Sequence, residues 1–178
     1  MNFSMNQKKM KTDYKFLIKD VDDFPIKGVS FKDISPLLAS PLFKNVVQEM
    51  GNLVLKPDYW VGVESRGFIF ASALAIEFGG GVVLCRKPGK LPGKIISQSY
   101  DTEYSSDQLS LQIGAGSVVI VDDVLATGGT LATVDKLCFS AGYNVQNHLV
   151  LIDLKYVPRS NYYLETKIKT LKSLISYE

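Results

Sequence analysis

The chain has few of the side chains that bind metals or form disulfides. It contains a single histidine, His148, and only two cysteines. Cys85 and Cys138 lie far apart in apolar surroundings, so we expect two buried thiols and neither a disulfide nor a metal pair. Such cysteine usage suits a reducing compartment. His148 falls within an expected strand, where a structural role is favoured over catalysis.

The net charge is small, and long apolar runs are absent from the sequence. The formal net charge is +2, which gives no indication of a nucleic-acid surface. No apolar run reaches membrane-spanning length, and residues 1–9 lack the hydrophobic core of a signal peptide. Repeats and low-complexity segments are absent from the sequence. We therefore expect a cytoplasmic protein with one domain, residues 1–178, and no nucleic-acid or membrane partner.

What the sequence does contain is a strand-like run followed by acidic, threonine and glycine residues. Residues 118–121 are all β-branched and apolar, which predicts a strand buried on both faces of a parallel sheet. Asp122 and Asp123 are expected at the carboxyl end of this strand, where α/β sheets bind ligands. A glycine-containing loop then leads into an expected helix, and its backbone N–H groups could hold an anion. The residues of this loop are Ala126, Thr127, Gly128, Gly129 and Thr130.

A phosphate site beside two carboxylates predicts a ligand with both phosphate and hydroxyl groups, such as a ribose phosphate. Asp122 and Asp123 would accept hydrogen bonds from the sugar hydroxyls or hold the water shell of a magnesium ion. The alternative is an acidic strand end before a purely structural glycine turn, which the whole run makes less favoured. The run lacks the Gly-Lys-Ser/Thr ending of a nucleotide-triphosphate P-loop, so a kinase or ATPase has little support.

Two further expected strands end in polar loops. The strand at 59–63 leads into Glu64-Ser65-Arg66-Gly67 and then an apolar helix. Arg66 suits pyrophosphate because its guanidinium donates two hydrogen bonds at once, although a local ion pair with Glu64 is the structural alternative. The strand at 81–85 leads into residues 86–94, where four cations alternate with proline and glycine. This composition is typical of a lid over a polyanion, with a solvated hairpin tip as the alternative.

These motifs, in this order, resemble those of the adenine phosphoribosyltransferases, which are type I phosphoribosyltransferases. The resemblance spans roughly residues 20–154. The run at 118–130 is similar to the family's phosphoribosyl-pyrophosphate (PRPP) loop, and residues 86–92 are similar to its Arg-Lys-x-Gly-Lys-Leu-Pro motif. The resemblance implies an α/β fold: a single domain with a mostly parallel twisted sheet flanked by helices. A small base-binding hood would come from residues 24–38 and 95–104.

The resemblance also assigns roles to single residues. Phe31, which the sequence alone would place in the core, would stack on adenine, while Ser30 and Lys32 would read the ring edge through their backbone. Glu103, otherwise an ordinary exposed carboxylate, would be the acid/base near the purine, with Arg66 as the second catalytic residue. A non-proline cis peptide is expected between Glu64 and Ser65. The PRPP and AMP contacts would be Asp122, Asp123, Ala126, Thr127, Gly128, Gly129 and Thr130, and the pyrophosphate contacts Ser65, Arg66, Arg86, Lys87 and Lys90.

The implied reaction converts adenine and PRPP into AMP and pyrophosphate. It implies Mg²⁺ held mainly through substrate and water, with no set of protein metal ligands, and a homodimer. One rival is a phosphoribosyltransferase for 6-oxo purines, which would use a lysine and an aromatic residue late in the chain; no clear match is found. The other is a non-catalytic PRPP-sensing regulator, which would normally carry a DNA-binding domain and a basic face. The chain departs from the family at Ser105 and after Leu154.

Overall fold

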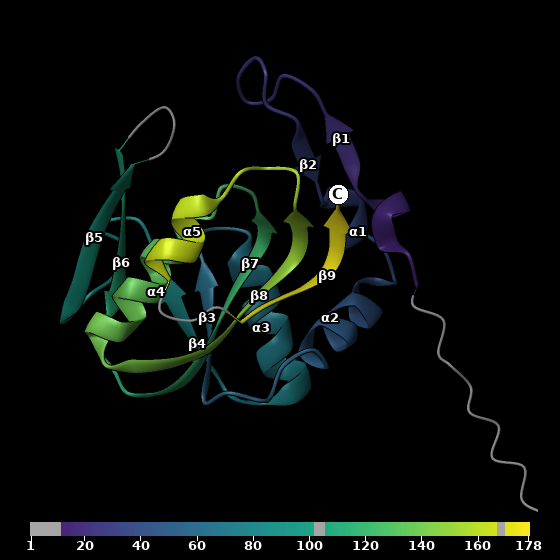
Figure 1. The fold of residues 1–178 in the computed structure, drawn as a ribbon. Helices are drawn as coiled ribbons and strands as arrows, with labels where there is room; N and C mark the ends of the chain where they lie inside the picture. The colour runs from purple at the N-terminus through teal and green to yellow at the C-terminus, as the bar shows by residue number, and fades with distance from the viewer. Residues whose placement is uncertain (1–11, 102–105, 167–169) are drawn as a thin grey trace, which may run out of the picture. The chain divides into compact units, whose positions relative to one another are not determined.

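The computed structural model describes residues 12–101, 106–166 and 170–178 (Figure 1). It consists of two compact units, one ending at Pro41 and the other running from Leu42 to Glu178. Each unit is described by itself, so the expected single domain over residues 1–178 stays a prediction. Within the described ranges, no helix is long and apolar enough to cross a bilayer.

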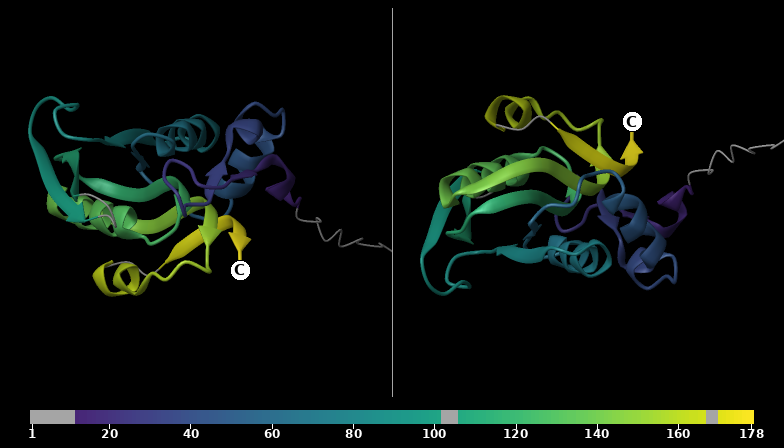
Figure 2. Two further views of the ribbon diagram at one scale, coloured as in Figure 1. Left: turned by 90° about the horizontal axis from the view of Figure 1, so that it is seen from above. Right: turned by 90° about the horizontal axis from the view of Figure 1, so that it is seen from below.

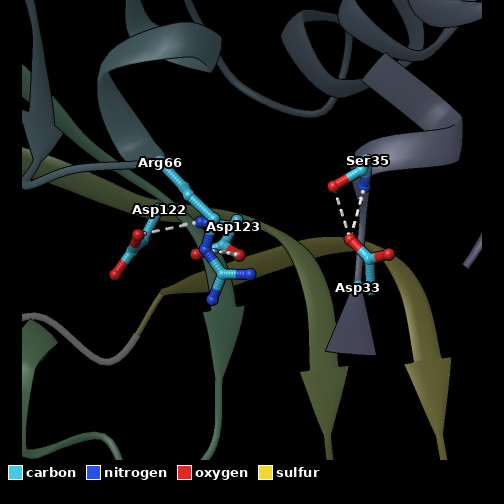
Figure 3. Close-up of polar contacts among 5 residues, drawn as sticks. All are labelled: Asp33, Ser35, Arg66, Asp122 and Asp123. Atoms are coloured by element: carbon cyan, nitrogen blue, oxygen red, sulfur yellow. Dashed lines mark hydrogen bonds and ion pairs between the residues drawn. The ribbon is translucent and has the colours of Figure 1, made fainter. Parts of the chain in front are cut away.

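The first unit is built on a short antiparallel strand pair. Its elements are the 3₁₀-helix η1 (Tyr14–Leu17), β1 (Lys19–Val21), β2 (Phe31–Asp33) and α1 (Ser35–Leu38). The loop that joins the strands contains a cis peptide at Phe24-Pro25, and the Phe24 ring packs edge-on against Phe31 with centroids 5.0 Å apart. Asp33 is the last residue of β2, and its Oδ1 accepts hydrogen bonds from the backbone N–H and the hydroxyl of Ser35, the first residue of α1, at 2.9 and 2.6 Å (Figure 3).

The second unit contains a five-stranded parallel sheet with the order β4-β3-β7-β8-β9. The strands are β3 (Tyr59–Val63), β4 (Gly81–Cys85), β7 (Gly116–Leu125), β8 (Tyr143–Leu154) and β9 (Leu171–Tyr177). β7 is central, and its residues 118–121 are fully buried, as their β-branched run predicts. The expected mostly parallel sheet flanked by helices is therefore confirmed.

Helices cover both faces of this sheet (Figure 2). They are α2 (Phe43–Gly51), α3 (Gly67–Phe78) and α4 (Gly129–Ala141). Gly62 of β3 faces α3 so closely that a Cβ there would lie 3.0 Å from the Ala71 Cβ. Its neighbours Val61 and Val63 point the other way, into a core cluster that includes Leu131 and Leu137 of α4. β3 and β7 are thus covered by α3 on one face and α4 on the other.

Three elements of the second unit were not predicted. The first is β6 (Ser106–Gln112), which packs against α4. It forms an antiparallel pair with β5 (Ile95–Asp101), a strand that was expected. The short helix α5 (Ser160–Glu165) and strand β9 follow β8. β9 runs parallel to β8 from His148, opposite Leu171, to Leu154, opposite Tyr177.

Candidate active site

The acidic pair lies within β7 and not after its end. We expected the strand to stop at Val121, but it continues to Leu125 because β8 keeps pairing with it, with Val124 opposite Ile152. β3 has its last pairing with β7 at Val121, so the two aspartates lie just beyond β3 on one side. They still face the carboxyl edge of the sheet, where the loop after β3 also arrives.

Arg66 reaches this acidic pair from the turn after β3. Its Nε lies 2.9 Å from Oδ2 of Asp123, and the Asp123 backbone N–H donates to Oδ1 of Asp122 at 2.9 Å (Figure 3). Asp123 is buried, whereas the Arg66 side chain is 35% exposed. Residues expected to contact pyrophosphate and ribose are thus joined directly across the β3–β7 pairing.

Burial makes both carboxyls reluctant to ionise. It raises the pKa of Asp122 well above its usual value, and the adjacent Asp123 charge raises it further. Burial also raises the pKa of Asp123, although the Arg66 guanidinium acts in the opposite direction. A cation or a hydroxyl donor that binds beside the pair would therefore favour the ionised form of both carboxyls.

The loop after β7 surrounds a small hollow at the start of α4. Gly128 caps the helix with a left-handed backbone, φ +85°, which a residue with a Cβ rarely adopts. A cavity of about 100 Å³ lies here, lined by Asp122, Val124, Leu125, Ala126, Thr127, Gly128, Thr130 and Leu131. Because the first N–H groups of a 13-residue helix lack intrahelical partners, this hollow offers donors to an anion.

The turn after β3 brings α3 close to the central strand. The Glu64-Ser65 peptide is cis, as expected. Gly67 begins α3 so near β7 that a Cβ would lie 2.5 Å from the Val121 carbonyl oxygen, which excludes any larger residue. The expected turn between strand and helix is therefore present, with Arg66 immediately before the helix.

Glu64 connects this turn to the basic loop that follows β4. Its Oε2 accepts a hydrogen bond from the Lys87 backbone N–H at 2.6 Å, and its Oε1 lies 3.4 Å from Arg86 Nη2. The Arg86 guanidinium also lies over the Phe68 ring, 5.7 Å from its centroid. Lys87 and Lys90 are exposed. Glu64 thus pairs with Arg86 in this region, while Arg66 pairs with Asp123.

Comparison with known proteins places this geometry in a family. A model for the phosphoribosyl transferase domain matches residues 38–145. The adenine phosphoribosyltransferase of Hydrogenovibrio crunogenus is 47% identical over 144 residues, which cover 78% of this chain and 83% of the relative. That of Thermosipho melanesiensis is 44% identical over 171 residues, covering 92% and 95%. The chain belongs to the adenine phosphoribosyltransferases.

Solved adenine phosphoribosyltransferases have the same fold. The Giardia lamblia enzyme complexed with 9-deazaadenine superposes with a TM-score of 0.83 at 35% identity, over 93% of this chain and 97% of that one. The enzyme of Thermoanaerobacter pseudethanolicus gives 0.81 at 38% identity, over 92% and 97%. These likenesses cover more than nine-tenths of the chain.

Some of the residues that the family resemblance singles out belong to the first unit or lie outside the described residues. Glu103 lies outside the described residues. Ser30, Phe31 and Lys32 belong to the first unit, where Ser30 is exposed and Phe31 is half-buried. The Lys32 side chain is buried and its Nζ pairs with Asp20, so only the backbone role expected of Lys32 is compatible with this contact.

Sequence reasoning missed one polar cluster of this phosphoribosyltransferase. His148, expected to be structural, is fully buried with hydrogen-bond partners at both ring nitrogens, Tyr162 and Asp135. No local pattern marks these three residues, because they come from β8, α5 and α4. Only the presence of a lone histidine among buried strand residues could have drawn attention to them.

Proposed function

We propose that this chain transfers the 5-phosphoribosyl group of PRPP to adenine, giving AMP and pyrophosphate in purine salvage. The observation that carries the proposal is the Asp122-Asp123 pair beside an anion-sized hollow at the start of α4, with Arg66 joined to the same pair. Relatives of nearly the same length, named adenine phosphoribosyltransferase, support the choice of reaction.

The 5-phosphate and the ribose would occupy the loop and the acidic pair. Backbone N–H groups and hydroxyls of residues 126–130 would hold the phosphate at the positive end of α4. Asp122 and Asp123 would accept hydrogen bonds from the sugar hydroxyls. Anchoring the sugar at both ends leaves its anomeric carbon as the part that moves during the reaction.

Displacement of pyrophosphate passes through a sugar with cationic character while negative charge grows on the leaving group. Cations aimed at that charge lower the barrier, because they stabilise it more in the transition state than in the bound substrate. Ser65, Arg66, Arg86, Lys87 and Lys90 would supply these contacts from the turn after β3 and the loop after β4. Glu103 would take the proton that the attacking purine nitrogen releases.

The donor set fits a magnesium ion that arrives with its substrate. Asp122 and Asp123 are adjacent carboxyls, and Asp122 lines the hollow at the start of α4 where the phosphate would lie. Mg²⁺ is commonly bound by one or two carboxylates together with water and substrate oxygens. When bound, it would neutralise charge on the pyrophosphate.

We also propose that Phe31 stacks on the adenine ring and that the backbone groups of Ser30 and Lys32 read its edge. The half-buried ring of Phe31, braced by Phe24, supports the first part. We propose a cytoplasmic location because Cys85 and Cys138 are free, buried thiols, which suit a reducing compartment.

We propose a homodimer whose interface is an apolar face formed by α3 and edge strand β4. Ile69 and Ile76 are seven residues apart, on the same face of α3, and Ile76 is 86% exposed. Val82 and Leu84 of β4 are also exposed, while the alternate residues Val83 and Cys85 face the core cluster around α4. A second copy of this chain would cover these side chains.

A steady-state assay with PRPP and Mg²⁺ tests the function, with adenine, hypoxanthine, guanine and xanthine offered separately. We expect AMP from adenine and little nucleotide from the other bases. Asp123→Asn, which keeps the shape of the side chain, should remove most of this turnover. A preference for a 6-oxo purine would overturn the adenine assignment, and PRPP binding without turnover on any base would favour a regulator.

A further inference from the structure

The side chain of Tyr162 packs directly against the phosphate loop. A Cβ built on Gly128 would lie 2.6 Å from the Tyr162 Cβ and 2.8 Å from the ring atoms Cγ and Cδ2. The Tyr162 side chain thus occupies the space beside the Gly128 Cα, at the residue that caps α4. Tyr162 is 1% exposed and does not line the cavity, so it contacts the loop from the side away from a ligand.

The hydroxyl of Tyr162 is held by a buried chain of hydrogen bonds. It lies 2.7 Å from Nδ1 of His148, whose Nε2 lies 3.1 Å from Oδ1 of Asp135. The Tyr162 hydroxyl can donate to Nδ1 while Nε2–H donates to the Asp135 carboxylate, so that every member of this hydrogen-bond series has a partner. The orientation of the Tyr162 ring is therefore fixed at its far end as well as at Gly128.

An ion pair also attaches α5 to α4 near the hydrogen bonds of Tyr162, His148 and Asp135. Lys136 of α4 forms an ion pair with Glu165 of α5, with Nζ and Oε2 2.7 Å apart. Within α5 itself, the Tyr162 carbonyl accepts hydrogen bonds from the backbone N–H and the hydroxyl of Thr166, the C-cap residue, at 3.1 and 2.9 Å. α5 is thus connected to the helix whose first turn forms the phosphate site.

We propose that Tyr162 is a positioning residue for the phosphate loop, held in place by His148 and Asp135. The inference rests on the proposed function, because it assigns the 5-phosphate of PRPP and AMP to residues 126–130. Gly128 has no side chain to fix its own backbone, and Tyr162 supplies that restraint from outside. A loop ordered before ligand arrives loses less conformational entropy on binding, so the restraint appears as affinity for the phosphate.

Tyr162→Phe tests this, because it removes the hydroxyl and keeps the ring. The loss of one hydrogen bond corresponds to about a 3- to 10-fold change. We expect the KM for PRPP to rise by that factor, while kcat and the KM for adenine stay within about 2-fold. By calorimetry, AMP should bind more weakly by the same factor, whereas binding of adenosine, which lacks the phosphate, should not change. Tyr163→Phe is the matched control, since Tyr163 is an exposed tyrosine on the same helix.

His148→Gln provides an independent second variant if Tyr162→Phe does not fold. The glutamine amide can replace Nε2–H toward Asp135, but it leaves the Tyr162 hydroxyl without its acceptor, so the same rise in KM for PRPP is expected. A folded variant with an unchanged KM for PRPP, or with lower thermal stability alone, would overturn the positioning role. A wild-type protein that forms no AMP would instead contradict the proposed function, and AMP affinities of wild type and variants would then decide the inference.

Discussion

The acidic pair combines two properties that oppose each other in the folded chain. Asp122 and Asp123 lie side by side, where burial raises the pKa of both carboxyls and the charge of Asp123 raises that of Asp122 further. Arg66 offsets part of this shift for Asp123 through the ion pair at 2.9 Å. The unliganded protein therefore sacrifices stability to keep two carboxylates ready for hydroxyl groups and a divalent cation.

Asp122→Asn should stabilise the unliganded protein at neutral pH while reducing its activity. The pKa of Asp122 is raised in the folded state, so the folded protein binds the proton more tightly than the unfolded chain does. The stability of the wild type should therefore increase as the pH falls through that folded-state pKa. Urea unfolding from pH 5 to pH 8 should show the asparagine variant to be more stable at pH 8, by on the order of 1 kcal/mol, with a smaller difference at pH 5.

The Asp122→Asn variant keeps a side-chain oxygen that can accept the hydrogen bond from the Asp123 backbone N–H. The difference in stability between the two proteins therefore does not include the loss of that hydrogen bond. A variant less stable than wild type at pH 8 would contradict the proposal that the ionised Asp122 carboxylate destabilises the unliganded protein. So would a difference between the two proteins that does not vary with pH.

At the scale of elements, local sequence pattern predicted the strands and loops that form the site. Strands at 59–63 and 81–85 have the expected bounds, because uninterrupted apolar runs identify buried parallel strands. The end of β7 was predicted too early because Asp122 and Asp123 look like a loop, and only pairing with β8 keeps them in the strand. Helix α5 was missed because six residues are too few for a helical apolar pattern. The contact between Tyr162 and Gly128 is tertiary and has no local signal.

The loop after β4 gives a prediction about charge. Lys90 is exposed, and its role in binding pyrophosphate rests on the family resemblance. Lys90→Ala should raise the KM for pyrophosphate in the reverse reaction with AMP by about 2- to 5-fold, because an exposed ionic contact contributes up to roughly 1 kcal/mol. The effect should shrink with added salt, which screens such contacts. Lys44→Ala, an exposed lysine of α2, is the control, and equal effects of the two substitutions would contradict a specific role.

At the scale of the molecule, the apolar face of α3 and β4 is the feature that the site itself does not explain. α3 is apolar nearly all round, although only one side of it packs on the sheet. Ile69, Ile76, Val82 and Leu84 remain exposed along a helix and a sheet edge. Exposed apolar side chains that lie together on a surface tend to associate, so a second copy would cover those of α3 and those of β4 at once.

Ile76→Glu should convert the proposed dimer into a monomer. A buried, unpaired carboxylate at the interface would weaken association by several kcal/mol. Sedimentation equilibrium measures the change, and Phe139→Glu, at an exposed apolar position on α4, is the control. If the wild type sediments as a monomer, or if both variants dissociate alike, this face is not the interface.

The pairing of β3 with β7 also determines when the site comes into existence during folding. Tyr59 pairs with Val118, so the chain must close a long loop before Arg66 can approach Asp123. Contacts between distant segments form slowly, and partly folded chains without this pairing lack the contact between Arg66 and Asp123. Only chains in which β3 has paired with β7 can therefore bind substrate fully. We expect bound PRPP or AMP to slow unfolding without accelerating folding.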